Sequence, residues 1–262
     1  MTWIVGAATS LGYAVGISDI RVTFADGSER DCLQKIYPMG RFTAAGFAGS
    51  VRIGFAMLEA LAHLLHPEPP PNQAFIPEEV VNCFCPLARD VFRQAPRDEQ
   101  ALHSHILLLS ADPAQIEGWP WGRCSVHVFR SPDFTPEAAN IGQVVSIGYG
   151  SVIPAYTEML ASFTAEPLSL LRGEMMGGQM GHLALTIAIQ GMVEANPVPG
   201  VSQHAHVCVV RRNSVAIGPN DHEQFMPTGE RIPFRMPAIA TSWIEFSRIA
   251  SEEARSPLAA VC

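Results

Sequence analysis

The first fifty residues of the chain constrain its fold more than any other stretch. Residues 2–8 and 12–18 are two short apolar runs with a Ser-Leu-Gly turn between them. Apolar runs joined by such a turn are typical of a β-hairpin. Because neither run alternates apolar and polar residues, we expect the sheet that contains them to be covered on both faces. Residues 22–24, 36–37 and 42–48 are also strand-like, so we expect the chain to begin with a group of strands.

At Ser50 the spacing of the apolar residues changes from that of strands to that of a helix. Apolar side chains recur every three or four residues up to position 65, and Ser50 is a suitable N-cap. The proline-rich segment 67–71 ends this helix. A second helix is predicted from Pro77 to about position 94, because proline and two glutamates favour a helix start.

The rest of the chain continues in separate blocks of strands and helices. We expect strands near 106–110, 125–130 and 143–147, helices over 153–171 and 175–196, a hairpin over 207–218 and a C-terminal helix near 240–254. Such blocks, without βαβ alternation, predict the α+β class. The length of 262 residues suits one domain over residues 1–220, with a C-terminal extension over residues 221–262 packed on it.

Composition excludes several classes of function. A net charge of −8 without a basic cluster argues against nucleic acid as a partner. The six cysteines form no Cys-x-x-Cys pair, which favours reduced thiols and no zinc site. The N-terminus has no basic region typical of an export signal, and the apolar segment 183–193 is too short to span a membrane. We therefore expect a soluble, cytoplasmic protein.

Thr2 is the first candidate for chemistry, because it follows the initiator methionine directly. Aminopeptidases remove that methionine when the next side chain is as small as that of threonine. The exposed residue would then carry both a hydroxyl nucleophile and an α-amine that serves as its base. Asp19 and Arg21 end the second apolar run, and Lys35 and Gly49 follow at spacings of sixteen and fourteen residues.

These residues together resemble the proteasome β-subunit family of N-terminal-nucleophile hydrolases. That family has an N-terminal Thr, an Asp-x-Arg at the end of its second strand, a Lys sixteen residues after this Asp, and Ala-Gly-Ser fourteen residues later. Thr2, Asp19, Arg21, Lys35 and Gly49 match this pattern in order and spacing. The Met-Thr start and the residues beyond position 218 make the chain more similar to bacterial proteasome-like proteins such as Anbu than to a 20S subunit.

The resemblance implies a four-layer αββα sandwich and a threonine-type amide-bond hydrolase that acts on peptides without a cofactor. The Thr2 hydroxyl would attack a carbonyl, assisted by its own α-amine. Lys35, held by Asp19, would lower the pKa of the nucleophile, and the Gly49 N–H would donate to the developing oxyanion.

The second half of the chain departs from the family pattern. Where the family has a serine in a Gly-Ser-Gly before the third helix, this chain has Tyr149, and the nearest serine is Ser151. Asn196 and Ser202 stand, at a longer spacing, where the family has Asp-x-x-Ser. Because an amide lacks the charge of a carboxylate, two alternatives stay open: a non-catalytic assembly module with this fold, and an acylase that cleaves a small amide.

Two further patterns concern metals and assembly. His103 with His105, and His204 with His206, would each place two imidazoles on one strand face, but no carboxylate or cysteine accompanies them at a fixed spacing. We therefore predict no metal site. The helix expected from 175 is apolar nearly all round, which indicates burial in a core or against a partner. We predict a homo-oligomer in which Thr2 faces an interior cavity or groove.

Overall fold

The computed structural model describes residues 2–66, 75–114, 122–165, 180–212, 214–219, 221–225 and 231–255. The fold is mixed α and β, and the ladders between its named strands are antiparallel, as the α+β prediction requires. Parts of the helices expected over 153–171 and 175–196 lie outside the described residues. Within the described part, no helix has both the length and the apolar character that a membrane crossing requires.

The first large sheet contains the predicted N-terminal hairpin. Its strand order is β10-β1-β2-β11-β12, and the bounds are β1 Trp3–Ala8, β2 Tyr13–Asp19, β10 Val144–Gly148, β11 Ala205–Arg211 and β12 Ser214–Pro219. All residues of β1 and β2 are buried, so the expectation of a sheet covered on both faces is confirmed. In the hairpin register, Ile4 lies opposite Ser18.

The second large sheet has the strand order β5-β6-β7-β8-β9. Its bounds are β5 Ile36–Gly40, β6 Thr43–Gly49, β7 Ser104–Asp112, β8 Arg123–Arg130 and β9 Glu137–Ala138. Apolar residues of both sheets, including Ile4, Leu107 and Cys208, form one buried cluster, so the sheets pack face to face.

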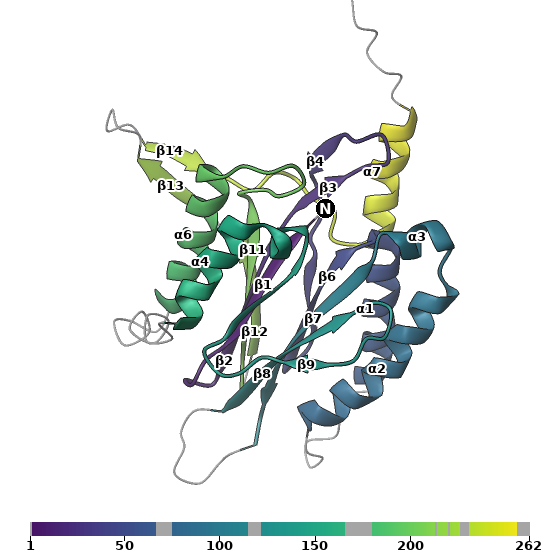
Figure 1. Ribbon diagram of the computed structural model, residues 1–262, viewed down its shortest axis with the longest axis vertical. Coiled ribbons are helices and arrows are strands. Elements are labelled where there is room, and N and C mark those ends of the chain that lie inside the picture. Colours follow the sequence, from purple (N-terminus) through teal and green to yellow (C-terminus); the bar gives the residue numbers. More distant parts are fainter. Residues whose placement is uncertain are drawn as a thin grey trace, which may run out of the picture.

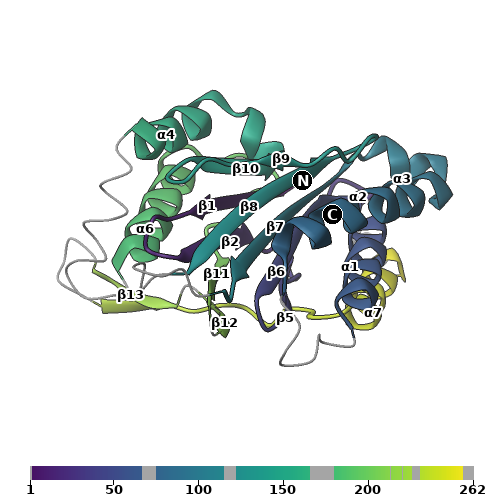
Figure 2. The ribbon, with the colours of Figure 1, turned by 90° about the horizontal axis from the view of Figure 1, so that it is seen from below.

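Helices cover the outer face of each sheet (Figures 1 and 2). The second sheet packs against α1 Val51–Leu65 and α2 Pro77–Gln94, the latter followed by the short α3 Arg97–Ala101. The Ser50 side chain accepts a hydrogen bond from the Ile53 N–H, which confirms it as the N-cap of α1. The first sheet packs against α4 Pro154–Ala165 and α6 Met180–Ala195, where Trp3 stacks on Tyr156. The 3-10 helix η1 Tyr149–Val152 leads into α4.

Two small hairpins go beyond the sequence prediction, which expected only the strand at residues 22–24. β3 Arg21–Thr23 pairs with β4 Glu29–Asp31, and β13 His222–Phe225 pairs with β14 Arg231–Phe234. The prediction missed β4, β13 and β14, because strands of three or four residues carry too few apolar positions to give a periodic signal. The predicted C-terminal helix is confirmed as α7 Trp243–Arg255, which lies beside α1 (Figure 1).

Candidate active site

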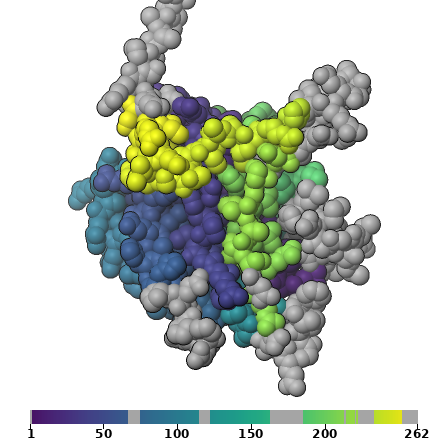
Figure 3. All heavy atoms as spheres, turned by 180° about the vertical axis from the view of Figure 1, so that it is seen from behind, coloured from purple at the N-terminus to yellow at the C-terminus, as the bar shows by residue number. Residues whose placement is uncertain are grey.

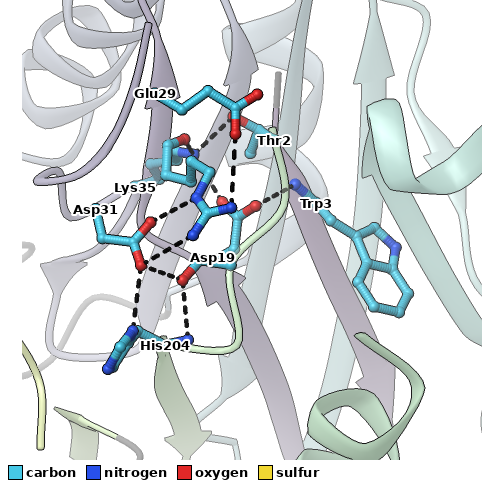
Figure 4. Close-up of polar contacts among 9 residues, drawn as sticks. Thr2, Trp3, Asp19, Glu29, Asp31, Lys35 and His204 are labelled. Atoms are coloured by element: carbon cyan, nitrogen blue, oxygen red, sulfur yellow. Dashed lines mark hydrogen bonds and ion pairs between the residues drawn. The ribbon is translucent and has the colours of Figure 1, made fainter. Parts of the chain in front are cut away.

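Thr2, Asp19 and Lys35 meet between the two large sheets, although 33 positions separate the first from the last. Lys35 Nζ donates to Thr2 Oγ1 at 2.8 Å and to Asp19 Oδ1 at 2.6 Å (Figure 4). The carbonyl of Arg21 accepts a third hydrogen bond from the same ammonium. All three side chains are buried, with exposed fractions of 5% for Thr2, 4% for Asp19 and 1% for Lys35.

The two sheets position these side chains through their backbones. The β1–β2 register brings the start of β1 beside the end of β2, and the Trp3 N–H donates to Asp19 Oδ2 at 3.2 Å. Lys35 directly precedes β5, and its carbonyl accepts from the Phe47 N–H of β6 at 3.0 Å. One sheet therefore supplies Thr2 and Asp19, and the other supplies Lys35.

Lys35 is the only lysine in the sequence; the other 16 of the 17 basic residues are arginines. Burial lowers the pKa of its ammonium from the ordinary value, and the neighbouring Asp19 carboxylate opposes this change. Burial likewise raises the pKa of Asp19, against the opposing effect of Lys35. An amine whose pKa lies below that of an exposed lysine exchanges a proton with a hydroxyl more readily near neutral pH.

Gly49, the fourth predicted site residue, ends β6 next to the start of β1. It is exposed and has φ of +101°, where a Cβ would lie 1.8 Å from the carbonyl oxygen of His103. A Cβ on Gly148 would touch both the Thr2 carbonyl oxygen, at 2.3 Å, and Ala48 Cβ, at 3.1 Å. Gly148, which ends β10, therefore lies against Thr2 in an approach that only glycine permits, whereas the His103 carbonyl is what requires glycine at position 49.

A second polar network lies beside the first and is centred on Asp31 (Figure 4). Arg21 Nε donates to Asp31 Oδ1 at 2.7 Å, and its guanidinium also lies 3.5 Å from Glu29. Ser202 Oγ donates to Asp31 Oδ2 at 2.6 Å, and His204 Nδ1 lies 3.2 Å from the same oxygen. Burial raises the pKa of Asp31, but these hydrogen bonds and the charge of Arg21 outweigh it, so that the pKa is lowered.

Comparison of the chain with models of protein families and with curated proteins found no match. The assignment of the site therefore depends on the residues and their geometry.

The remaining predicted site residues do not all lie near Thr2. Arg21 and Ser202 lie in the Asp31 network, whereas Tyr149 is 44% exposed on η1. Ser151 Oγ donates to the Gly148 carbonyl at 2.6 Å and so supports the glycine beside Thr2. The Asn196 side-chain amide donates to the Met192 carbonyl at the end of α6, and the Asn196 backbone carbonyl accepts from the Tyr156 hydroxyl. Asn196 thus stabilises the first sheet's helices.

Sequence reasoning missed Asp31 and Gly148. No local pattern identifies Asp31, because its partner Ser202 lies 171 positions away. The uniqueness of Lys35 was a signal that the sequence did contain. The histidine pairs do not share strand faces: His103 and His204 precede β7 and β11, and His204 instead stacks on Phe234 at 4.3 Å.

Proposed function

We propose that the protein is a threonine-type, peptidase-like amide-bond hydrolase that uses Thr2 as its nucleophile after removal of Met1. One observation carries the proposal: Lys35 Nζ lies 2.8 Å from Thr2 Oγ1 while Asp19 holds it from the other side at 2.6 Å. The arrangement of two face-to-face sheets with helices on both outer faces supports the αββα sandwich of the N-terminal-nucleophile hydrolases.

In this reaction the Thr2 hydroxyl oxygen attacks the carbonyl carbon of the substrate amide. The hydroxyl proton passes to the Thr2 α-amine, which the same residue places within reach, and later to the leaving amine. Lys35 donates a hydrogen bond to Thr2 Oγ1 and stabilises negative charge on it, with Asp19 fixing the direction of the ammonium. Water then hydrolyses the ester on Thr2 and restores the free hydroxyl.

The oxyanion that forms on the carbonyl requires a hydrogen-bond donor near Thr2. The exposed end of β6 at Gly49 precedes the N-terminus of α1, where the first turn of a helix carries partial positive charge. A preorganised donor of this kind contributes about 2.7–4 kcal/mol in other hydrolases. We therefore assign the oxyanion contact to the Gly49 N–H.

The proposal is tested by intact-mass measurement after incubation with two probes. A peptide vinyl sulfone traps the Thr2 hydroxyl, whereas a peptide epoxyketone also needs the free α-amine. We expect one adduct from each probe, mapped to Thr2, and loss of both adducts in Thr2→Ala. Thr157→Ala, which removes an exposed hydroxyl bonded to Pro154 on α4, is the matched control and should label normally.

A second candidate function is a non-catalytic assembly module with the same fold. The exposure of Tyr149 and the turn of Asn196 toward Met192 favour it, because neither residue supports the α-amine. An N-terminus at Thr2 without an adduct from either probe would support this module. Retention of Met1 would contradict the amine-assisted mechanism. Hydrolysis of small amides without hydrolysis of peptides would favour an acylase.

A further inference from the structure

The C-terminal strap, which we define as residues 233–246, lies against the segment that leads into Lys35. Ala240 forms a parallel bridge with Leu33, and both residues are buried. The Ala240 N–H donates to the Cys32 carbonyl at 2.7 Å, and the Gln34 N–H donates to the Ala240 carbonyl at 2.9 Å. The strap is therefore hydrogen-bonded to the chain on both sides of Leu33, immediately before Lys35.

The same segment is bonded on its other side to the end of β2. The N–H groups of Cys32 and Leu33 both donate to the carbonyl of Ile20 at 3.1 Å, and Ile20 follows Asp19. Residues 32–34 are thus held between Ile20 and Ala240. Movement of Ala240 away from Leu33 would release the side of this segment that β2 does not hold.

Aromatic contacts anchor the strap at both ends. Phe234 stacks on His204, whose Nδ1 reaches Asp31, and at the other end Phe246 stacks on Phe24 with centroids 6.3 Å apart. Trp243 packs against Phe55 of α1 at 6.1 Å. Figure 3 shows the yellow C-terminal residues lying across the purple N-terminal segment, between the blue helices and the green strands.

We propose that the strap is a positioning element for Lys35, with Ala240 acting through residues 32–34 to keep Nζ on Thr2 Oγ1 and away from water. The inference rests on the proposed function for the role of Lys35, but the contacts of Ala240 are independent of it.

Loss of the strap has a specific electrostatic consequence. The charged and titratable groups that face Lys35 are Asp19 on β2, Asp31 on β4 and Cys32, together with the Thr2 hydroxyl and the Arg21 carbonyl. Asp19, the Thr2 hydroxyl and the Arg21 carbonyl have no contact with Ala240 among those described above, so we expect them to stay in place when Ala240 is displaced, whereas water gains access to the ammonium. Because burial is the largest cause of the lowered Lys35 pKa, hydration moves that pKa upward.

The experiment compares Ala240→Pro, which removes the N–H that donates to Cys32, with Ala238→Pro at an exposed position of the same strap. Since the chain has one lysine, protein labelled with 13C-lysine gives one ε-carbon signal, which reports the titration of Lys35 directly. We expect this titration to move to higher pH in Ala240→Pro and to match the wild type in Ala238→Pro. Vinyl-sulfone labelling of Thr2 should fall by about tenfold to a hundredfold in the first variant only.

A folded Ala240→Pro protein with the wild-type Lys35 titration and labelling rate would overturn the proposal. If that variant does not fold, Trp243→Ala replaces it, because Trp243 is 40% exposed and its removal loosens the same end of the strap. It should shift the titration in the same direction, and an unchanged titration would also overturn the proposal. If wild-type Thr2 forms no adduct, the hydrolase proposal fails, while the lysine titration still decides the role of the strap.

Discussion

The Lys35 ammonium is subject to two opposing effects at the residue scale. Burial disfavours its charge, and the carboxylate of Asp19 at 2.6 Å favours it. A buried pair of this kind is costly to break, because the remaining partner keeps an uncompensated charge. Lys35 Nζ also lies 2.8 Å from Thr2 Oγ1, and we propose that the pair serves catalysis as well as stability.

Replacement of Lys35 separates these two roles. We expect Lys35→Met to lower the free energy of unfolding by about 3–5 kcal/mol, since Asp19 stays buried without its cation. The double variant with Asp19→Asn should recover most of this loss, because the amide oxygen still accepts from Trp3 without carrying charge. Neither variant should label with the vinyl sulfone. Denaturant unfolding and intact mass measure both quantities, and a labelled double variant would contradict the catalytic role.

The lowered pKa of Asp31 predicts how the stability of the protein changes at acid pH. Its folded pKa is lower than the ordinary value of 3.8, so its contribution to stability is present above that pH and is lost as pH falls through the folded value. We expect Asp31→Asn to lower the unfolding free energy by about 1 kcal/mol at neutral pH, because partial exposure screens the pair with Arg21. This difference should vanish in acid. Asp90→Asn, on the exposed side of α2, is the control, and a difference that persists below the folded pKa would contradict the assignment.

At the scale of elements, the junction of β6 and α1 is set by the backbone of Gly49. Strand pairing places Gly49 opposite Ser104, and the Ser50 N–H donates to the His103 carbonyl at 3.2 Å. This oxygen occupies the space that a side chain at position 49 would need. The same conformation directs the chain into the first turn of α1.

Two glycine substitutions test this junction. Gly49 and Gly27 both have positive φ, but a Cβ on Gly27 meets nothing within 4 Å. We expect Gly27→Ala to cost about 1–2 kcal/mol, from backbone strain alone. Gly49→Ala should cost more, because the clash with the His103 carbonyl involves backbone that cannot turn aside. Thermal unfolding compares the two, and equal losses would contradict the assigned geometry.

At the scale of the whole molecule, α6 leaves part of its apolar surface uncovered. It buries Leu185, Ile189 and Val193 against the first sheet, while Ile187 is 58% exposed. The C-terminal helix α7 does not cover this surface, because it lies beside α1 on the other side of the molecule (Figure 2). Self-association through this face remains our proposal.

Light scattering behind a sizing column tests the association at micromolar concentration. We expect a particle several times heavier than the 28.3 kDa chain, and dissociation in Ile187→Glu. Ile244→Glu, which changes a residue 72% exposed on α7, is the matched control and should leave the particle intact. A monodisperse particle of one chain in the wild type would contradict the proposal.

The sequence by itself determined those features that depend on neighbours in the chain. The unbroken apolar runs of β1 and β2, the apolar spacing of α1 and the Pro-Glu-Glu start of α2 each predicted an element that the structure contains. The spacing of Thr2, Asp19, Lys35 and Gly49 was sufficient to propose a site. In a hairpin of fixed register, the number of residues between two positions determines how close they lie in the fold.

Only the tertiary structure revealed the contacts of Asp31 and Ala240. Ser202 reaches Asp31 across 171 positions, and Ala240 pairs with Leu33 through backbone groups that every residue possesses. Neither contact has a sequence pattern. A backbone hydrogen bond can form whatever the side chain is, and two polar residues far apart in the chain have no fixed spacing. Both contacts depend on how the two sheets and the C-terminal strap pack, and that packing is a property of the folded chain as a whole.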